Sequence, residues 1–348
     1  LTAIVCSSGV GDLATGIASF TIASGTSVIC TFTSYNSLAA TTQLIGNFMA
    51  LQGTLLMGNL PEANRRMDRL QGVVQTTGSS VPALMGYMAA AGNGTLQMPV
   101  LSASLAQINA ITDQSPSALD VWFQATLGSY SLEGLSGKFG IVSAGADYLM
   151  SKDLLIGGFV QGDVQPDSRD SAGGSASGQG WLVGPYATVR LTDGLYLDLL
   201  GGVGQSANTI SPDGSYTDTF TANRWLASGS LSGQWQSGDL TISPTATLSY
   251  FQSTSQAYFD SIGVAIPEVT SGTGELALGP TIGYRFELGD GLTVNTRITL
   301  DGVFRLTQSK DAITAALHAR LNAGFNIATP GGASFSLSGG LDGLGGTS

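Results

Sequence analysis

The chain has 348 residues, of which 11% are charged, and it carries a net charge of −11 at pH 7. Charges are scarce, since about 25% is typical of soluble globular domains, yet no apolar run reaches the roughly 20 residues of a membrane helix. The acidic balance argues against a nucleic-acid-binding protein, which needs a basic surface. Glycine accounts for 49 residues without a collagen period, a content that a β-barrel wall tolerates.

Residues 1–36 form a first region that opens with neither a Met nor a signal peptide, so we expect a fragment or a processed form. The stretches Ser19–Ala23 and Val28–Thr33 are typical of short strands, but they are too small to bury a core. We interpret the region as the end of a larger β-sandwich-like module. Its cysteines, Cys6 and Cys30, predict one disulfide and an extracytoplasmic setting. Two free thiols are the alternative.

Residues 37–71 change to helical spacing. The helix predicted over 38–57 has twenty residues, and at 1.5 Å each these span about 30 Å, enough to thread a barrel. A break at Asn59-Leu60-Pro61-Glu62 starts a second helix that contains Arg65-Arg66-Met67-Asp68-Arg69-Leu70. Residues 72–118, rich in Gly, Ser and Ala, predict a linker. The predicted pore-helix residues are Leu44, Asn47, Phe48, Leu51 and Leu55.

From residue 119 onward, apolar and polar residues alternate in eleven stretches that predict strands. The most regular, Ile313 to Ile327, exceeds the roughly 5–6 residues usual in globular proteins and suits the about 9–11 residues that cross a bilayer at a tilt. Tight turns alternate with long polar stretches, the pattern of short periplasmic turns and long outer loops. The predicted strands are 120–128, 139–150, 154–162, 181–191, 195–206, 220–235, 240–251, 275–288, 292–306, 313–328 and 333–342, and the long polar stretches are 163–180, 207–219 and 252–274.

These strands predict an all-β membrane fold, an antiparallel transmembrane β-barrel over 119–348. Eleven is an odd number, whereas single-chain bacterial barrels have an even number of strands and pair both terminal strands. The chain stops at Gly345-Gly346-Thr347-Ser348, which is turn chemistry. We therefore expect a twelve-stranded barrel with an N-terminal pore helix, whose last strand is missing from the C-terminus.

The alternation also assigns charged side chains to the lumen. A charge on the lipid-facing side at the bilayer midplane costs about 2–4 kcal/mol, so charged strand positions determine which face points inward. One interpretation is a solvated wall whose ion pairs stiffen the barrel and hold an inserted segment. The other is a selectivity ring for small solutes. The predicted lumen-lining residues are Arg190, Asp198, Arg224, Glu275, Arg285, Arg297, Asp301, Arg305, His318 and Arg320.

Three motifs carry a resemblance to a known family: the stretch from Gly184 to Leu191, Arg224-Trp225-Leu226-Ala227, and the stretch from Gly279 to Tyr284. They resemble the translocator domain of proteobacterial autotransporters (type V secretion), and residues 65–70 are similar to a basic helix that precedes some of these barrels. The resemblance covers about 38–348. It implies a twelve-stranded outer-membrane barrel with a helix through its pore, anchoring an N-terminal passenger at the cell surface. The family's usual final strand, which closes on an aromatic residue, is absent.

The stretch Cys30-Thr31-Phe32-Thr33 resembles the closing strand of an extracellular β-sandwich module found upstream in some of these proteins. The resemblance therefore implies that 1–36 is the end of a passenger module.

The sequence contains no pattern that indicates catalysis. The single histidine, His318, is expected to face the lumen, and no serine is marked as a nucleophile beside it. Two cysteines with one distant histidine do not make a metal site. We therefore predict no enzyme activity, no catalytic residue, no metal and no cofactor.

The leading hypothesis is a translocator and anchor in the bacterial outer membrane, with the N-terminal region extracellular and a passenger displayed at the cell surface. We expect it to be a monomer whose partners are outer-membrane lipid, its own passenger, the outer-membrane barrel-assembly machinery and periplasmic chaperones. No nucleic acid is expected. The alternatives are a passive outer-membrane porin and the anchor of a surface adhesin whose function lies in upstream modules.

Overall fold

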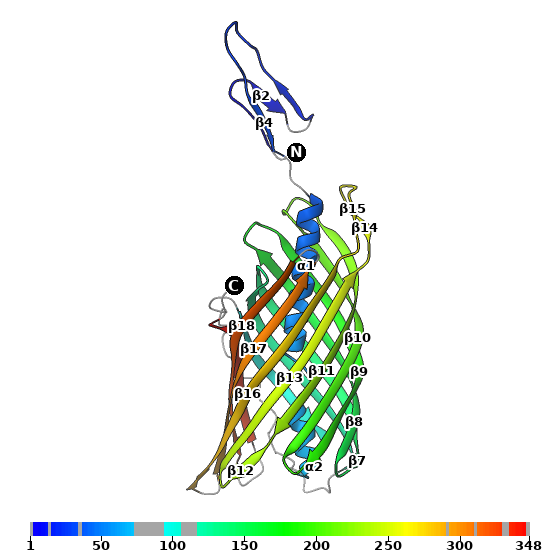
Figure 1. Cartoon of the computed structure of the whole chain (residues 1–348), viewed down its shortest axis with the longest axis vertical. Coiled ribbons are helices and arrows are strands. Elements are labelled where there is room, and N and C mark those ends of the chain that lie inside the picture. The colour runs from blue at the N-terminus through cyan, green and yellow to red at the C-terminus, as the bar shows by residue number, and fades with distance from the viewer. Residues whose placement is uncertain are drawn as a thin grey trace.

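The computed structural model describes residues 3–12, 15–33, 37–72, 94–105, 117–289, 292–309, 312–328 and 334–345. Its main body is an antiparallel β-barrel that surrounds helix α1 (Ser37–Met57), with helix α2 (Ala63–Gln71) at one end (Figure 1). The barrel strands are β5 (Gly94–Ser104), β6 (Leu119–Leu132), β7 (Leu135–Ser151), β8 (Leu154–Asp170), β9 (Ser175–Thr192), β10 (Leu195–Ser211), β11 (Asp218–Gly233), β13 (Leu240–Ser255), β16 (Thr270–Leu288), β17 (Leu292–Ser309), β18 (Ala312–Ala328) and β19 (Ser334–Leu344).

Every barrel strand pairs with a neighbour on each side, so the sheet closes. The order runs from β5 through β11, continues across the β11–β13 pairing to β16, β17, β18 and β19, and returns from β19 to β5. The short strand β12 (Trp235–Ser237) pairs with β13 alone. Of the thirteen strands in this sheet, the other twelve form the ring among the described residues. The predicted twelve-stranded antiparallel barrel is confirmed.

The twelfth strand of the ring is not the C-terminal strand that the sequence predicts. Strand β5 comes from the segment 72–118 and occupies the position between β19 and β6, so the linker assignment is wrong for Gly94–Ser104. The expectation that the twelfth strand is a missing C-terminal one is likewise wrong. With β5, the ring of described strands already has an even number of members. The pairing of β5 with β6 shifts register between Pro99 and Leu101. Because proline has no backbone N–H to donate to the neighbouring strand, Pro99 interrupts the strand pattern in the sequence.

The long polar stretches expected to be outer loops are mostly strand. Strand β8 continues to Asp170 and β9 begins at Ser175, which leaves a four-residue turn. Only the segment 256–269 keeps a longer excursion, with the small strands β14 (Tyr258–Phe259) and β15 (Ala265–Ile266). Ladder hydrogen bonds satisfy the backbone whether or not lipid covers the side chains, so polar residues do not end these strands.

Helix α1 is buried along most of its length inside the barrel. Leu44, Phe48, Leu51 and Leu55 are buried, while Asn47 is half-buried. The helix packs against strands that include β13, β16 and β17, and its apolar side chains join those of the inner wall in one core. Among the helices in the described ranges, none is long and apolar enough to cross a membrane.

One glycine sets how closely α1 approaches the wall. A Cβ added at Gly53 would come within 2.4 Å of the Phe251 ring on β13. Both faces of this contact are buried, so the ring cannot move into solvent. Overpacking of this kind costs about 1–3 kcal/mol.

We therefore expect Gly53→Leu to lower the temperature at which the barrel loses its compact mobility in gel electrophoresis. Gln43→Leu is the matched control, because Gln43 is exposed on the same helix. Equal transition temperatures for wild type and Gly53→Leu would show that α1 does not pack against Phe251.

Residues 3–33 form two small antiparallel pairs beyond the N-terminal end of α1 (Figure 1). Strand β1 (Ala3–Cys6) pairs with β4 (Cys30–Thr33), and β2 (Val10–Asp12) pairs with β3 (Ile17–Ser19). Cys6 and Cys30 lie opposite each other and are joined by a disulfide. Apolar side chains such as Val10 stay exposed, as expected for a piece too small to form its own core.

Candidate functional site

Helix α2 closes one end of the lumen through three arginines. Arg65 forms ion pairs with Asp120 on β6 and with Asp147 on β7, and Arg69 also pairs with Asp147. Arg66 pairs with Asp198 on β10. These arginines sit at i, i+1 and i+4, so one short helix contacts three strands of the wall. We call the three arginines and three aspartates the α2 lock.

Arg66 is the most enclosed of the three arginines in the α2 lock. Its side chain is 1% exposed, and it donates from Nε and Nη2 to the two carboxylate oxygens of Asp198 at 2.9 and 2.7 Å. Nη1 donates to the carbonyl oxygen of Pro61, and the guanidinium lies 4.6 Å from the centroid of the Tyr186 ring. This two-point geometry gives a strong, directional pair. Removing one partner would leave a buried, uncompensated charge, which typically costs about 3–5 kcal/mol.

Two further contacts hold the end of α2. Gly72 adopts a left-handed conformation with φ 70° and ends the helix, donating to the Arg69 and Asp68 carbonyls. Arg190 on β9 donates to the Leu70 carbonyl oxygen, one of the groups that the helix leaves unpaired at its C-terminus. Gln71 contacts Gln234 at 2.5 Å. The helix end is therefore attached to the wall by neutral as well as charged contacts.

Polar groups on α1 also find partners in the wall. Gln52 donates to Gln165 at 3.1 Å and to Asn208 at 2.9 Å. At the other end of the helix, Thr41 Oγ1 lies 3.2 Å from the Tyr216 hydroxyl in the loop after β10. Burial raises the pKa of Tyr216, with the Thr41 hydrogen bond opposing, so this phenol stays neutral near pH 7. Buried side-chain hydrogen bonds of this kind favour one position for a helix in a polar lumen.

A second charged cluster lies across the ring from the α2 lock, on strands β16 to β19. Arg305 and Arg320 both contact Glu275 and Asp342, with N–O distances from 2.6 to 3.2 Å. His318 Nε2 lies 2.7 Å from Asp342. All five side chains are buried or nearly so, and they come from β16, β17, β18 and β19. The cluster joins four consecutive strands of the wall.

The remaining predicted lumen residues are not joined to either cluster in the described residues. Arg224 forms a buried ion pair with Asp163 on β8. Arg297 and Asp301 line a lumen cavity of about 470 Å³ beside the segment between α1 and α2. Arg285 is exposed near the end of β16 and pairs with Glu287 at 3.4 Å. These positions place nine of the ten predicted residues against the lumen or its helices, and leave Arg285 in solvent.

Sequence reasoning predicted Asp198 but missed the other two carboxylates that the helix arginines contact. Asp120 and Asp147 were not assigned to the lumen, although each occupies an inward position of an alternating stretch. Asp163, the partner of Arg224, falls in the stretch 163–180 that the sequence predicts as a loop. Asp342 was missed because it lies among glycines near the chain end. Arg65, Arg66 and Arg69 were noted only as a basic helix. Charged residues at inward strand positions, set against a basic helix, were the available signal.

The described residues show no metal-binding arrangement, since within them no group of three His, Cys, Asp or Glu side chains is placed to hold an ion. The charged groups instead neutralise one another in pairs and clusters. These ion pairs are structural: they hold α2 to the wall and hold neighbouring strands together.

Comparisons with known proteins bear on the barrel region. The family model described as autotransporter beta-domain matches residues 121–345. No curated protein matches the chain significantly in sequence.

Solved structures similar to the chain include three autotransporter domains. The β domain of the Bordetella autotransporter BrkA is 17% identical with a TM-score of 0.45, over 72% of this chain and 96% of that chain. The translocator domain of NalP from Neisseria meningitidis is 10% identical with a TM-score of 0.43, over 88% and 98%. The transport unit of AIDA-I from Escherichia coli is 10% identical with a TM-score of 0.33, over 88% and 97%.

Proposed function

The chain belongs to the autotransporter β-domain family, whose members export and anchor an N-terminal passenger at the outer membrane, and we propose that α1 and α2 plug its pore. In this proposal, residues 37–71 are the pore-threading segment and the lumen residues described above hold it. The observation that supports it best is the α2 lock, in which Arg65, Arg66 and Arg69 pair with Asp120, Asp147 and Asp198.

The two ends of the barrel differ in a way that supports an orientation. Helix α2 lies beside tight turns, since Arg190 and Gln234 contact it and both flank such turns. The N-terminal end of α1 lies at the opposite end of the barrel, where Thr41 contacts Tyr216 in the loop between β10 and β11. The longest described connection, which contains β14 and β15, projects at this same end (Figure 1). Outer-membrane barrels have short periplasmic turns and longer extracellular connections. We therefore place residues 1–36 at the cell surface, as the end of a passenger module.

The closed ring supports a monomer, because each of its twelve described strands already has a hydrogen-bonded neighbour on both sides. Insertion of such a ring would need the outer-membrane barrel-assembly machinery, with periplasmic chaperones to protect the unfolded strands. Within this chain we assign no catalytic residue. His318, the only histidine, is held against Asp342 inside the wall.

A passive porin is the second candidate, because the cavity lined by Arg297 and Asp301 leaves part of the lumen unfilled. An α1–α2 plug held by buried ion pairs fits a porin poorly. The third hypothesis, the anchor of a surface adhesin, differs only in the function of the passenger and requires the same plugged barrel.

An epitope inserted after Gly25 tests the orientation. Gly25 lies in an open turn with a φ of +83° and no atom within 4 Å of a built Cβ, so an insertion there disturbs no packing. We expect antibody to label intact cells. A matched insertion between Lys152 and Asp153, in the turn between β7 and β8, should be labelled only after permeabilisation. The reverse pattern, or no labelling at Gly25 in intact cells, would overturn surface display.

A further inference from the structure

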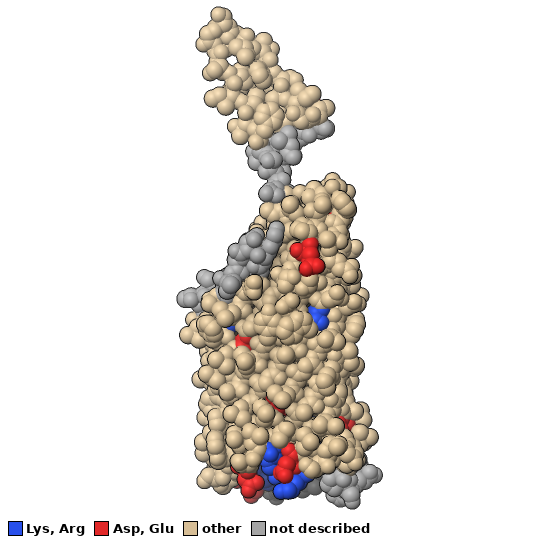
Figure 2. All heavy atoms as spheres, turned by 45° about the vertical axis from the view of Figure 1, so that its right-hand side comes forward, with Lys and Arg blue, Asp and Glu red and all other residues tan. Residues whose placement is uncertain are grey.

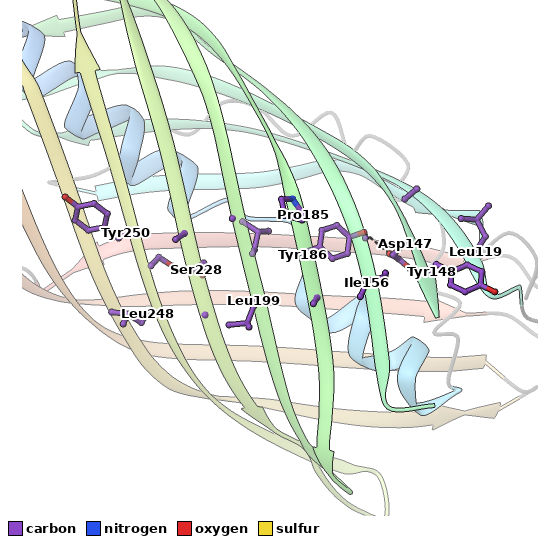
Figure 3. A pocket seen from close by; sticks show the side chains of 18 residues that line it. Leu119, Asp147, Tyr148, Ile156, Pro185, Tyr186, Leu199, Ser228, Leu248 and Tyr250 are labelled. Atoms are coloured by element: carbon purple, nitrogen blue, oxygen red, sulfur yellow. Dashed lines mark hydrogen bonds between the residues drawn. The ribbon is translucent and has the colours of Figure 1, made fainter. Parts of the chain in front are cut away.

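A groove crosses the outer surface of the barrel from β7 to β13, and its volume is about 960 Å³, within the roughly 300–1,000 Å³ typical of small-molecule sites. Figure 3 shows Leu119 and Tyr148 at one end, toward α2, and Tyr250 at the other. The face of the barrel seen in Figure 2 carries few charged side chains, and the largest group of them lies at the α2 end.

The floor of the groove is a row of small residues that continues from strand to strand. Ala146 on β7 lies opposite Gly158 on β8, and Gly158 lies opposite Pro185 on β9. Gly201 on β10 then lies opposite Ala227 on β11. Leu200 lies opposite Tyr186, so the same register places Gly201 beside Pro185. Paired residues point to the same face of a sheet, so these five form one row across the strands, and Ala146, Pro185, Gly201 and Ala227 of this row line the groove. We call this row the furrow.

Bulky side chains border this furrow on both sides. On one side Tyr148, Ile156 and Leu199 are 42–48% exposed, and Leu248 is 64% exposed. On the other side, Val183 lies opposite Val203, which lies opposite Trp225. Among the described residues that line the groove, Asp147 alone is charged. Its side chain is buried and accepts a hydrogen bond from the buried Tyr186 hydroxyl (Figure 3). The groove therefore presents an apolar channel to the membrane.

The length of the groove matches one leaflet. Five steps between strands of about 4.8 Å each give roughly 24 Å. Strands of outer-membrane barrels tilt by about 35–45°, so the furrow at right angles to them rises about 14–17 Å along the membrane normal. Half of a hydrocarbon core of about 30 Å is about 15 Å. The furrow thus extends from the α2 end of the barrel to near the bilayer midplane.

We propose that this groove binds one acyl chain of a membrane glycerophospholipid, with the head group at the Tyr148 end. The occupant follows from the location: the groove is continuous with the lipid-facing wall of an outer-membrane barrel, and its lining is apolar. Tyrosine favours the membrane interface. Lys152, four residues beyond Tyr148 in the turn after β7, is 85% exposed and pairs only weakly with Asp153 at 3.5 Å. Its ammonium group offers a contact to a lipid phosphate.

The test fills the groove without disturbing the barrel. A Cβ at Gly201 would meet nothing closer than a carbonyl oxygen at 3.9 Å, so the double variant Gly201→Leu with Ala227→Leu occupies the furrow from its floor. Gly302→Leu is the matched control, because Gly302 lies on β17 outside the groove and its nearest contact is a carbonyl oxygen at 3.8 Å. Each protein is purified from cells in mild detergent and examined by native mass spectrometry for retained phospholipid.

We expect wild type and Gly302→Leu to retain one phospholipid per barrel, and the double variant to retain at least tenfold less. Equal retention in all three proteins, no phospholipid on wild type, or a lipid A-type glycolipid in its place would overturn the proposal. Heat-modifiable gel mobility checks that each barrel is folded. Surface labelling after Gly25 reports separately on the passenger function, so failure of one does not imply failure of the other.

A second measurement uses the unmodified chain. Wild-type barrel is reconstituted with phospholipid that carries a photoreactive diazirine on one acyl chain, and cross-linked peptides are mapped by mass spectrometry. Cross-links concentrated on residues 183–187, 199–203 and 225–229 support the groove. Cross-links spread equally over the outer faces of β16, β17 and β18 would overturn it.

Discussion

Arg66→Ala is expected to release α2 from the wall and to make it sensitive to protease. The substitution leaves Asp198, whose side chain is 10% exposed, without its two-point partner. Loss of one member of a buried pair typically costs about 3–5 kcal/mol, which converts to a shift of more than a hundredfold in the docked population. Trypsin should therefore cut the remaining α2 arginines at least tenfold faster in purified, membrane-inserted protein.

A double-mutant cycle separates this pairing from general damage to the barrel. Arg66→Ala with Asp198→Ala removes both charges, so its loss should be smaller than the sum of the two single losses. Arg169→Ala is the matched surface control, because Arg169 is 73% exposed and pairs with an exposed Asp167. If Arg66→Ala were cut no faster than Arg169→Ala, the α2 lock would not hold the helix.

Deletion of residues 37–71 is expected to open the pore. An α-helix with its side chains is about 10–12 Å across, and α1 with α2 occupies the lumen beside strands from β7 to β17. Removing both helices should raise single-channel conductance in planar bilayers by roughly several-fold, since ions then pass through water instead of around a packed helix. Wild-type protein should show small or rare openings.

The deletion also distinguishes the two candidate functions. An unchanged conductance would contradict the plug and favour a porin whose lumen is already open beside the cavity at Arg297 and Asp301. Gln43→Leu, an exposed position on α1, serves as the control that keeps both helices. It should conduct as wild type does. Retained heat-modifiable mobility in the deleted chain is needed to show that the ring still closes.

The positions of the strands, and the face that each side chain occupies, were predictable because the two faces of a barrel strand contact different environments. Lipid outside and a polar lumen inside impose a period of two on every strand. The alternation from Ile313 to Ile327 accordingly falls within β18, and Glu275, Arg305 and Arg320 meet in one buried cluster. The strand ends beyond the bilayer were not predictable, because water on both sides removes the alternation while the ladder continues. The sequence therefore predicts a loop over 163–180, where the structure has strand up to Asp170 and again from Ser175.

Strand β5 and the α2 lock depended on contacts between segments far apart in the chain. Gly94–Ser104 is a strand only because β19 and β6 both lie beside it, and its Pro99 weakens any local signal. Arg66 and Asp198 are separated by 132 residues, and nothing in either local sequence specifies the other as its partner.

The sequence by itself determined the class of this protein: a membrane barrel with an N-terminal helix, eleven of its strands, and the inward direction of most of its charges. Alternation and glycine-rich turns encode these locally, through the solvent that each side chain meets. Only the tertiary structure decided which strand completes the ring, which carboxylate each arginine contacts, and where small residues line up into a groove. Those features arise from register between strands, and register is a relation among segments that no single stretch of sequence contains.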